Sequence, residues 1–580
     1  MKDWFVIKNI NDLAIDMINI NKNENEEQEI TEIIPAILYT LYVYHLNFNV
    51  KDPMWCNRDR VVMSSSCDSA FFYVNLFFAG FNYEIGELKK YGHLNKISSS
   101  LTYNPNLGID ISNNIFFTEI VSAVGMALGE KIYESKILNN SNIINFYTYV
   151  ICQATDLLNG INFEACHFAS SNKIGKLIII CYSLKENDVI RIFKSLKWHC
   201  TVIRNKSVNE LNKALNKAKI ILDKPSIIEI KIKKHPKNKL KQNNKRSFNI
   251  SKEAVLFYRK KLNIRTVKNY YDWQNNLKLT LKKDYPDLIK NIIKNKNKSK
   301  LELDSNIILN DVFNKKLSDI NKEILDILKS KFKLLHNLSA TKQIIGPLLN
   351  GLSLVNLKVY TTCNLKYCDY LFPAIKASAI MNISPIYIFY YDYKNIARLF
   401  QTIDKLNYLR NTFNLKIYRP ADIKELIGSL MYIFSLNKPA VLIVSNYKNT
   451  KIYNSSSKKI KYGAYIIRNE VKKLDALIVA TGAEVYLALE IANKLYSENI
   501  DLRVVSIPCK ENFEEQDDSY KNAILPKASK IFVIEDSIDF SWLKYTYKTE
   551  NIISCNIYKS YTNQKYLAAK EIMEIIRKNL

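Results

Sequence analysis

The sequence contains no C-x-x-C pair, although ten cysteines occur among its 580 residues. Closely spaced cysteine pairs mark zinc ribbons, and conserved even sets of cysteines in a short secreted chain mark disulfide frameworks. The scattered cysteines of this chain indicate neither. Because thiols stay reduced in the cytosol, we expect free cysteines in a cytoplasmic protein.

Long apolar runs are also missing. A membrane-spanning helix needs about 18 or more consecutive apolar residues, and no segment of the chain approaches this length. The first residues, MKDWFVIKNINDLAIDM, contain no adequate apolar core of a signal peptide. We therefore expect a soluble, cytoplasmic protein with no membrane partner.

The sequence has a charge imbalance but no nucleic-acid-binding motif to accompany it. Its formal net charge is +28 and its pI is about 9.4, which raises nucleic acid or an anionic surface as a partner. However, no helix-turn-helix pattern and no interleaving of aromatic with basic residues accompanies the charge. Lys, Asn and Ile are abundant throughout, so we favour a general compositional bias over a nucleic-acid partner.

The residues that are present predict a globular chain with several cores. Hydrophobic residues make up 47% of the sequence, and a chain of this length suggests three or so domains at roughly 150 residues each. Amphipathic helical patterns at Ile34–Tyr44 and Ala70–Phe78 alternate with short apolar runs rich in β-branched residues. Such runs are typical of buried parallel strands, and we predict three of them, TYVICQ, KLIIICY and SIIEIKI.

Two further α/β regions follow a basic, Asn-rich zone. That zone includes the charge runs Lys233–Asn249 and Asn291–Lys300, with one or two helices expected between them. Beyond it, PIYIFYY and AVLIVS predict strands of a second α/β unit, and LDALIVATGAEV, DLRVVSIP and KIFVIED predict strands of a third. Strands that alternate with helical stretches favour doubly wound sheets.

Seven ordered segments resemble the transketolase family of thiamine-diphosphate enzymes. In chain order they are Leu41–Arg60, Val121–Lys131, Gly346–Gly351, Asp369–Met381, Tyr418–Asp422, Val479–Val485 and Phe513–Ala528. They cover nearly the whole chain, which makes the match far more specific than a single Gly-rich turn.

The resemblance implies three doubly wound α/β domains with mostly parallel sheets. We predict a diphosphate-binding-like domain at 1–235, a basic linker at 236–310, a pyrimidine-binding-like domain at 311–455 and a C-terminal domain at 456–580. The resemblance also implies a homodimer whose active sites lie between subunits. An active member transfers two-carbon ketol units between sugar phosphates in the pentose phosphate pathway.

The metal ligands that the family supplies are missing at the aligned positions. A cation that holds a diphosphate needs hard oxygen ligands. Here the family's Gly-Asp-Gly is Gln153-Ala154-Thr155, and its Asp-Ser-Asn is Tyr182-Ser183-Leu184. Asp156 follows the first motif directly, and we interpret it as a residue of a helix N-terminus. We therefore expect no metal at the former ligand positions, which are Ala154 and Leu184.

The positions that carry catalysis in the family are replaced as well. Lys342 stands at the position where the family has the acid that activates the cofactor. Glu27, Cys67 and Leu101 stand where the family has the histidines of three motifs. Bulky residues and a carboxylate, Asn114 to Glu119, stand in place of a second phosphate loop. We interpret the six histidines that are present as packing or surface residues and keep His93, which lies near a replaced motif, as a candidate for a role; the six are His45, His93, His167, His199, His235 and His336.

Part of the pyrimidine-binding region keeps its aromatic character. Asn364, Tyr367 and Tyr370 align with the family's aromatic cluster, so two of these three positions could still stack a ring or could be core residues. The phosphate-binding arginine of the family aligns with Asn446, and the loop Tyr390–Phe400 is shorter than in the family.

These losses suggest a pseudoenzyme that acts through contact with another protein and needs no cofactor. Its partner would be a second copy of the chain or an intact transketolase paralogue. The alternative is a divergent, active transketolase that uses thiamine diphosphate and Mg²⁺, for which Asp156, Glu119 and Glu27 are the acids near the aligned site. A third hypothesis, an anionic-surface or nucleic-acid binder, rests on charge alone.

Overall fold

The computed structural model describes two compact units. One contains Met1–Ser305 and Gln343–Leu357, and the other contains Asn306–Lys342 and Lys358–Leu580. The residues described are 2–21, 33–93, 97–113, 118–137, 143–183, 188–204, 207–231, 250–284, 306–309, 340–391, 403–445, 452–527, 529–537, 539–560, 563–566 and 569–580.

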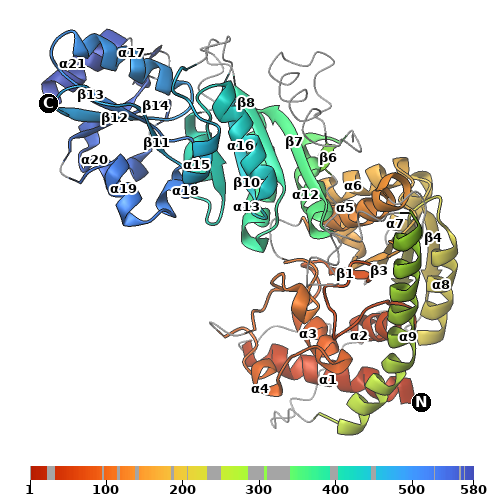
Figure 1. Ribbon diagram of the computed structural model, residues 1–580. Coiled ribbons are helices and arrows are strands. Elements are labelled where there is room, and N and C mark those ends of the chain that lie inside the picture. The colour runs from red at the N-terminus through yellow and green to blue at the C-terminus, as the bar shows by residue number, and fades with distance from the viewer. Residues whose placement is uncertain are drawn as a thin grey trace. The chain divides into compact units, whose positions relative to one another are not determined.

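The first unit contains a five-stranded parallel sheet in the order β1-β2-β3-β5-β4 (Figure 1). Its strands are β1 (Arg60–Met63), β2 (Thr148–Gln153), β3 (Leu177–Ser183), β4 (His199–Ile203) and β5 (Ser226–Lys231). The register pairs Gln153 with Tyr182 at the carboxyl ends of β2 and β3. The three strands predicted here are therefore confirmed.

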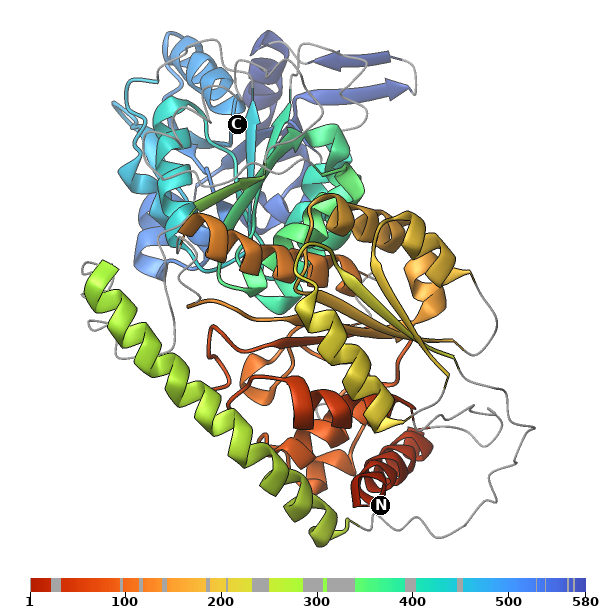
Figure 2. The same ribbon diagram turned by 90° about the vertical axis from the view of Figure 1, so that its right-hand side faces the viewer.

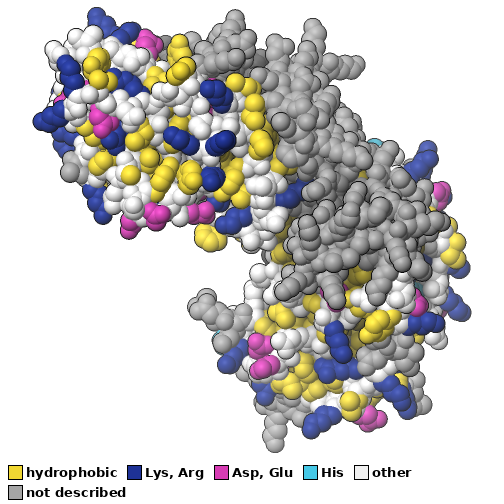
Figure 3. Space-filling model, viewed as in Figure 1, with side chains coloured by type: hydrophobic (Ala, Val, Ile, Leu, Met, Phe, Trp, Pro, Cys, Tyr) yellow, Lys and Arg dark blue, Asp and Glu magenta, His cyan; other side chains and the backbone are white. Residues whose placement is uncertain are grey.

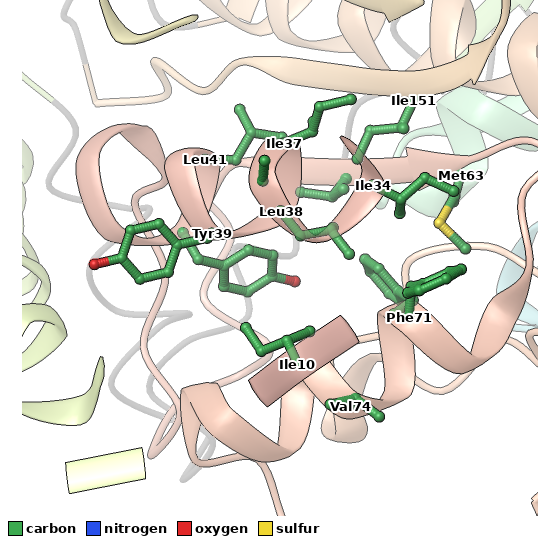
Figure 4. Close-up of a cluster of buried hydrophobic side chains, with 14 of the residues drawn as sticks. Ile10, Ile34, Ile37, Leu38, Tyr39, Leu41, Met63, Phe71, Val74 and Ile151 are labelled. Carbon is green, nitrogen blue, oxygen red and sulfur yellow. The ribbon is translucent and has the colours of Figure 1, made fainter. Parts of the chain in front are cut away.

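Helices cover this sheet and supply its core. They are α1 (Lys2–Asn21), α2 (Ile33–Thr40), η1 (Leu41–His45), α3 (Ser69–Ala79), α5 (Glu119–Ile132), α6 (Gly160–Ser171), α7 (Val189–Ser195) and α8 (Val208–Ile220). Figure 4 shows side chains of α1, α2 and α3 packed together with Met63 and Ile151 of the sheet. The predicted helical patterns at Ile34–Tyr44 and Ala70–Phe78 thus form helices, although the first continues as a π-helix in η1.

A long helix, α9 (Lys252–Asp284), packs against α1, α3 and η1 (yellow-green in Figure 2). Tyr258 is fully buried and donates a hydrogen bond to Asn75 Oδ1 at 2.8 Å, and Trp273 Nε1 donates to Ile143 O at 2.7 Å. The helix lies between the two basic runs, where the sequence predicted one or two helices.

Helix α12 (Lys342–Leu354) belongs to the first unit from Gln343 onward and crosses α5 there at very short distance. A Cβ atom on Gly125 would lie 2.4 Å from Leu348 O, and one on Gly351 would lie 2.0 Å from Ser122 O. Only glycine leaves room for two backbones at this separation. The segments Val121–Lys131 and Gly346–Gly351 are therefore two sides of one packing contact.

The second unit contains two five-stranded sheets. The first has the order β6-β7-β8-β10-β9 and is entirely parallel. Its strands and helices are β6 (Asn306–Leu309), β7 (Lys358–Asn364), α13 (Cys368–Met381), β8 (Ile386–Tyr391), α15 (Ile403–Arg410), β9 (Lys416–Tyr418), α16 (Ile423–Ser435) and β10 (Ala440–Ser445). The predicted strands PIYIFYY and AVLIVS are β8 and β10.

The other sheet has the order β11-β13-β12-β14-β15, and β11 is antiparallel to its neighbour. Helices α17 and α21 cover one face and α18, α19 and α20 the other (Figure 1). The elements are β11 (Tyr465–Arg468), β12 (Ala476–Ala480), α17 (Glu484–Tyr496), β13 (Leu502–Ser506), α18 (Lys510–Glu514), α19 (Asp518–Ile524), β14 (Ile531–Glu535), α20 (Leu543–Thr546), β15 (Ile552–Ser554) and α21 (Ala569–Asn579); β16 (Asn556–Ser560) and β17 (Asn563–Tyr566) form a hairpin.

The fold is thus of the α/β class with mostly parallel sheets, as predicted. Burial of both faces explains why the central strands are apolar throughout: Ile478 packs on one side of the last sheet and Val479 on the other. All ten cysteines are free thiols. Among the described residues, no helix is both long and apolar enough to cross a membrane.

Candidate functional site

The predicted site positions fall into two groups, one in each unit. In the first unit they lie at the carboxyl ends of β1, β2 and β3, where parallel α/β sheets usually bind ligands. In the second unit they lie after β7 and at the start of α12.

Cys67 follows β1 and is buried, with 3% of its surface exposed. Its Sγ atom lies 3.6 Å from the hydroxyl of Tyr182 and 3.7 Å from the carbonyl oxygen of Ile151. Burial raises the pKa of the thiol to about 12, so it stays protonated at neutral pH. A neutral thiol neither shuttles protons near pH 7 nor acts as a nucleophile.

The turn after β2 is closed by its own side chains. Gln153 is the N-cap of a 3₁₀-helix, η4 (Ala154–Leu158), and its backbone N–H donates to Asp156 Oδ2 at 3.1 Å. The hydroxyl of Ser66 also donates to this carboxylate oxygen. Asp156 therefore lies in the first turn of a helix, as the sequence suggested. Ala154 is buried and Thr155 is exposed.

Leu101 is connected to the first residue of α3, Ser69, by two hydrogen bonds through Asn113. Its backbone N–H donates to Asn113 Oδ1 at 2.7 Å, and Asn113 Nδ2 donates to the hydroxyl of Ser69 at 3.3 Å. The Leu101 side chain is buried. An apolar side chain here packs and offers no proton donor or acceptor.

In the second unit, Lys342 and Tyr367 are in direct contact. Lys342 Nζ lies 2.9 Å from the centroid of the Tyr367 ring. Asn364 ends β7, and its side chain accepts a hydrogen bond from the Lys366 backbone N–H at 3.1 Å. The rings of Tyr367 and Tyr370 are 6.5 Å apart and tilted by 46°, and Tyr370 is 50% exposed.

One residue of this group is not among the sequence predictions. Lys366 places its Nζ 4.7 Å from the centroid of Tyr367. The signal was present in the sequence, since a lysine directly precedes the tyrosine, but it becomes meaningful only when Lys342 is placed on the same ring.

The histidines that the structure describes support the structural interpretation. His45 is buried and its Nε2 lies 2.8 Å from Asn212 Oδ1, while His199 Nδ1 lies 3.1 Å from the Ser226 hydroxyl. His93 and His167 are exposed. Several other predicted positions lie outside the described residues, namely Glu27, Asn114 to Phe117, Leu184, His235, His336 and Asn446.

The residues described do not fit a metal-bound diphosphate. Ala154 offers a methyl group where a hard oxygen ligand is needed, and the carboxylate of Asp156 accepts hydrogen bonds from Gln153 and Ser66. Within the described part of the chain, no group of three or more His, Cys, Asp or Glu side chains is placed to hold a metal ion. The ammonium of Lys342 likewise has the wrong charge to replace a carboxylic acid beside an aminopyrimidine ring.

Two family models match the chain. One, described as transketolase, thiamine diphosphate binding domain, matches residues 3–327, and the other, described as transketolase-like TK C-terminal domain, matches residues 463–570. The first covers more than half of the sequence. The chain therefore belongs to the transketolase family.

Relatives extend the match over almost the full length. The transketolase of Bacillus subtilis is 26% identical over 589 residues, covering 88% of each chain, and that of Aquifex aeolicus is 26% identical over 632 residues, covering 96% of this chain and 91% of the relative. A transketolase mutant from Pichia stipitis superposes with a TM-score of 0.81 at 22% identity, covering 94% of this chain and 92% of the other, and the transketolase of Leishmania mexicana with 0.80 at 21%, covering 100% and 96%. These solved structures show the same fold.

Proposed function

We propose that this transketolase-family chain is non-catalytic and acts through contact with another protein chain, without thiamine diphosphate. The observation that carries the proposal is the turn after β2. Ala154 presents no ligand there, and the nearest acid, Asp156, is hydrogen-bonded into the first turn of η4. Binding of a diphosphate through a divalent cation would need oxygen ligands that this turn does not provide.

The replacement in the second unit supports the same proposal independently. A carboxylic acid at the position of Lys342 would share a proton with an aminopyrimidine ring and stabilise the positive charge that develops there, whereas the positive charge of a lysine would oppose it. The lysine also lies on the ring of Tyr367, a surface that a stacked cofactor would otherwise use.

A second candidate is a divergent active transketolase that transfers two-carbon ketol units between sugar phosphates with thiamine diphosphate and Mg²⁺. The comparisons favour it, because the relatives that match over 88% and 96% of this chain are themselves named transketolase. The replaced residues weigh against it, since new metal ligands would be required; Glu119, buried at the start of α5, is one remaining acid.

A calorimetric titration separates the two candidates. Thiamine diphosphate is added to the full chain in the presence of Mg²⁺, with the Bacillus subtilis transketolase as the positive control. The non-catalytic proposal expects no binding at micromolar cofactor. Saturable, magnesium-dependent binding would instead establish the second candidate's cofactor requirement and overturn the first.

A further inference from the structure

Strand β4 forms one edge of the sheet in the first unit. Within the described part of the chain it pairs with β5 alone, and the His199 N–H donates to Pro225 O at 3.0 Å on the β5 side. Successive residues of a strand direct their backbone groups to opposite edges. Cys200 and Val202 therefore present their N–H and C=O groups to the outer edge, where no described residue bonds to them.

The usual protection of an edge strand is missing from β4. Edge strands are commonly protected by proline, by charged side chains on the strand or by a bulge. The sequence of β4 is HCTVI, and its register with β5 continues through all five residues without an irregularity. Val202 is 41% exposed. The outer edge of β4 is therefore a template on which another extended segment can pair.

Positive charge flanks β4 on both faces of the sheet. Helices α7 and α8 both contact the strand (Figure 1). Burial lowers the pKa of His199, and the charges of Lys224 and Lys217 lower it further. Burial raises the pKa of the Cys200 thiol to about 11, and the charge of Lys194 opposes this shift. Because neighbouring side chains of a strand point to opposite faces, these ammonium groups lie on both sides of β4.

Most of these cations have no counter-charge in the described structure. From Asp188 to Lys224, the described residues include eight Lys or Arg against three Asp or Glu, and Asp188 already pairs with Arg191. Six of the eight form no ion pair in the part of the chain that is described; they are Lys194, Lys197, Arg204, Lys213, Lys217 and Lys224. We call these six side chains and the outer edge of β4 the basic edge.

The charge of the basic edge selects its occupant. Pairing of two β4 edges would bring both sets of cations together, and like charges across an interface repel. Single-stranded nucleic acid binds by stacking on aromatic residues, whereas β4 contains no Phe, Tyr or Trp. The unpaired backbone groups of a strand are complementary to those of an extended peptide. An acidic peptide segment matches both the backbone and the charge.

We propose that the basic edge binds an extended, acidic segment of another protein, which adds to the sheet beside β4. The segment would exchange main-chain hydrogen bonds with Cys200 and Val202, and its carboxylates would lie against Lys194 and Lys217. The inference rests on the proposed function, because it names the surface through which a non-catalytic chain contacts its partner.

The test is a titration of the full chain with a short, fluorescently labelled peptide of alternating glutamate and valine, blocked at both ends. Fluorescence anisotropy at low salt measures binding. A peptide with lysine in place of glutamate and a thymidine oligonucleotide are titrated in parallel. We expect the acidic peptide to bind at least about tenfold more tightly than either. Its affinity should fall as salt is added.

Matched variants locate the site. Val202→Pro removes one outward N–H, at a position where an edge strand tolerates proline, and should weaken peptide binding about fivefold or more. Lys194→Glu combined with Lys217→Glu should weaken it about tenfold or more.

The control is Lys252→Glu combined with Lys260→Glu. It makes the same change of charge on α9, which packs against α1, α3 and η1. This control should bind the peptide as the unmodified chain does. Circular dichroism confirms that each variant is folded, and the Lys194 and Lys217 variant carries the test if Val202→Pro is not folded.

Three results would overturn the inference. The first is an acidic peptide that does not bind below about 1 mM. The second is an oligonucleotide that binds as tightly as the peptide, which would show a general preference for polyanions. The third is an oligomer, seen by light scattering, that Val202→Pro dissociates, which would show that β4 pairs with a second copy. The proposed function fails by a different result, namely magnesium-dependent binding of thiamine diphosphate, which leaves the peptide titration unchanged.

Discussion

At the carboxyl ends of β1, β2 and β3, the side chains bond to one another. Cys67 meets Tyr182, and Ser66 and the Gln153 backbone both donate to Asp156. Buried polar groups normally need such partners. A new ligand at this edge would have to break these contacts. The residues that replace the family's motifs therefore stabilise one another in a closed arrangement.

Restoring two metal ligands should therefore not restore activity. We predict that Ala154→Asp combined with Leu184→Asn gives no transketolase turnover in the presence of thiamine diphosphate and Mg²⁺. The new carboxylate would be buried close to Asp156, Lys342 would remain, and groups that act as a unit are not recovered singly. A coupled spectrophotometric assay measures turnover, and a cofactor-dependent rate in this variant would contradict the prediction.

The buried carboxyl group of Glu425 makes the free energy of unfolding depend on pH. Glu425, fully buried in α16, accepts hydrogen bonds from the hydroxyls of Tyr465 and Ser506 at 2.6 and 2.7 Å and from the Ala421 N–H at 2.6 Å. Burial nevertheless raises the pKa of Glu425 from 4.5 to about 7. The folded state thus binds this proton more tightly than the unfolded state, so stability falls as pH rises from about 4.5 through 7.

The substitution Glu425→Gln should remove this dependence. Between pH 5.5 and 8, the unfolding free energy of the unmodified chain should fall by roughly 2 kcal/mol more than that of the variant. Urea unfolding at the two pH values, followed by circular dichroism, measures the difference. Parallel losses in both proteins would show that Glu425 does not titrate as described.

At the scale of elements, the segments shared with the family are packing contacts. Arg419 in Tyr418–Asp422 forms ion pairs with Glu484 at 3.1 Å and Glu535 at 2.8 Å, and its carbonyl accepts from the Gly482 N–H at 3.1 Å. Arg419 therefore joins YRPAD to VATGAEV through Glu484 and Gly482. None of these three contacts needs a cofactor.

The crossing of α5 and α12 gives a sharp test of packing. Gly125→Ala should destabilise the first unit by roughly 1–3 kcal/mol, because its Cβ would lie 2.4 Å from Leu348 O. Gly86→Ala in α4 (Ile85–Leu88) is the control, since a Cβ there has no atom within 4 Å, and it should be neutral or slightly stabilising. Thermal melts measure both; equal melting temperatures for the two variants would refute the proposed contact.

The sequence predicts individual helices and strands better than it predicts which of them come into contact. Central strands such as β3 are visible because both faces are buried and apolar. The strand β4 was missed because it is an edge strand whose side chains are mostly partly exposed. The replaced positions could be named from the family resemblance, but the contact of Lys342 with Tyr367 depends on which distant elements meet.

At the scale of the whole molecule, one face shows how the charged side chains of the described residues are distributed. On the face shown in Figure 3, Lys and Arg side chains are interspersed with apolar and acidic ones. On this face, the arrangement favours the compositional interpretation of the +28 net charge over a dedicated nucleic-acid surface.

Assembly is predicted to be independent of cofactor. The apolar residues of α5 are buried inside their own unit, whereas α13 and α15 expose Tyr370, Ile380 and Tyr408, each about half exposed. We predict a dimer, with a second copy or an intact transketolase paralogue, whose melting temperature does not respond to thiamine diphosphate and Mg²⁺, because a ligand stabilises only what it binds. Light scattering and thermal melts test this; a strict monomer, or a cofactor-dependent rise in melting temperature, would count against it.

The most direct measurement of the central claim is two-carbon transfer by the purified chain. Xylulose 5-phosphate and ribose 5-phosphate are supplied with saturating thiamine diphosphate and Mg²⁺, and the Bacillus subtilis transketolase is assayed beside it. With Ala154 directly after β2 and Lys342 on Tyr367, the chain should form no product above the enzyme-free reaction. Product that accumulates in proportion to the amount of chain, and only when the cofactor is present, would show that it is an active transketolase.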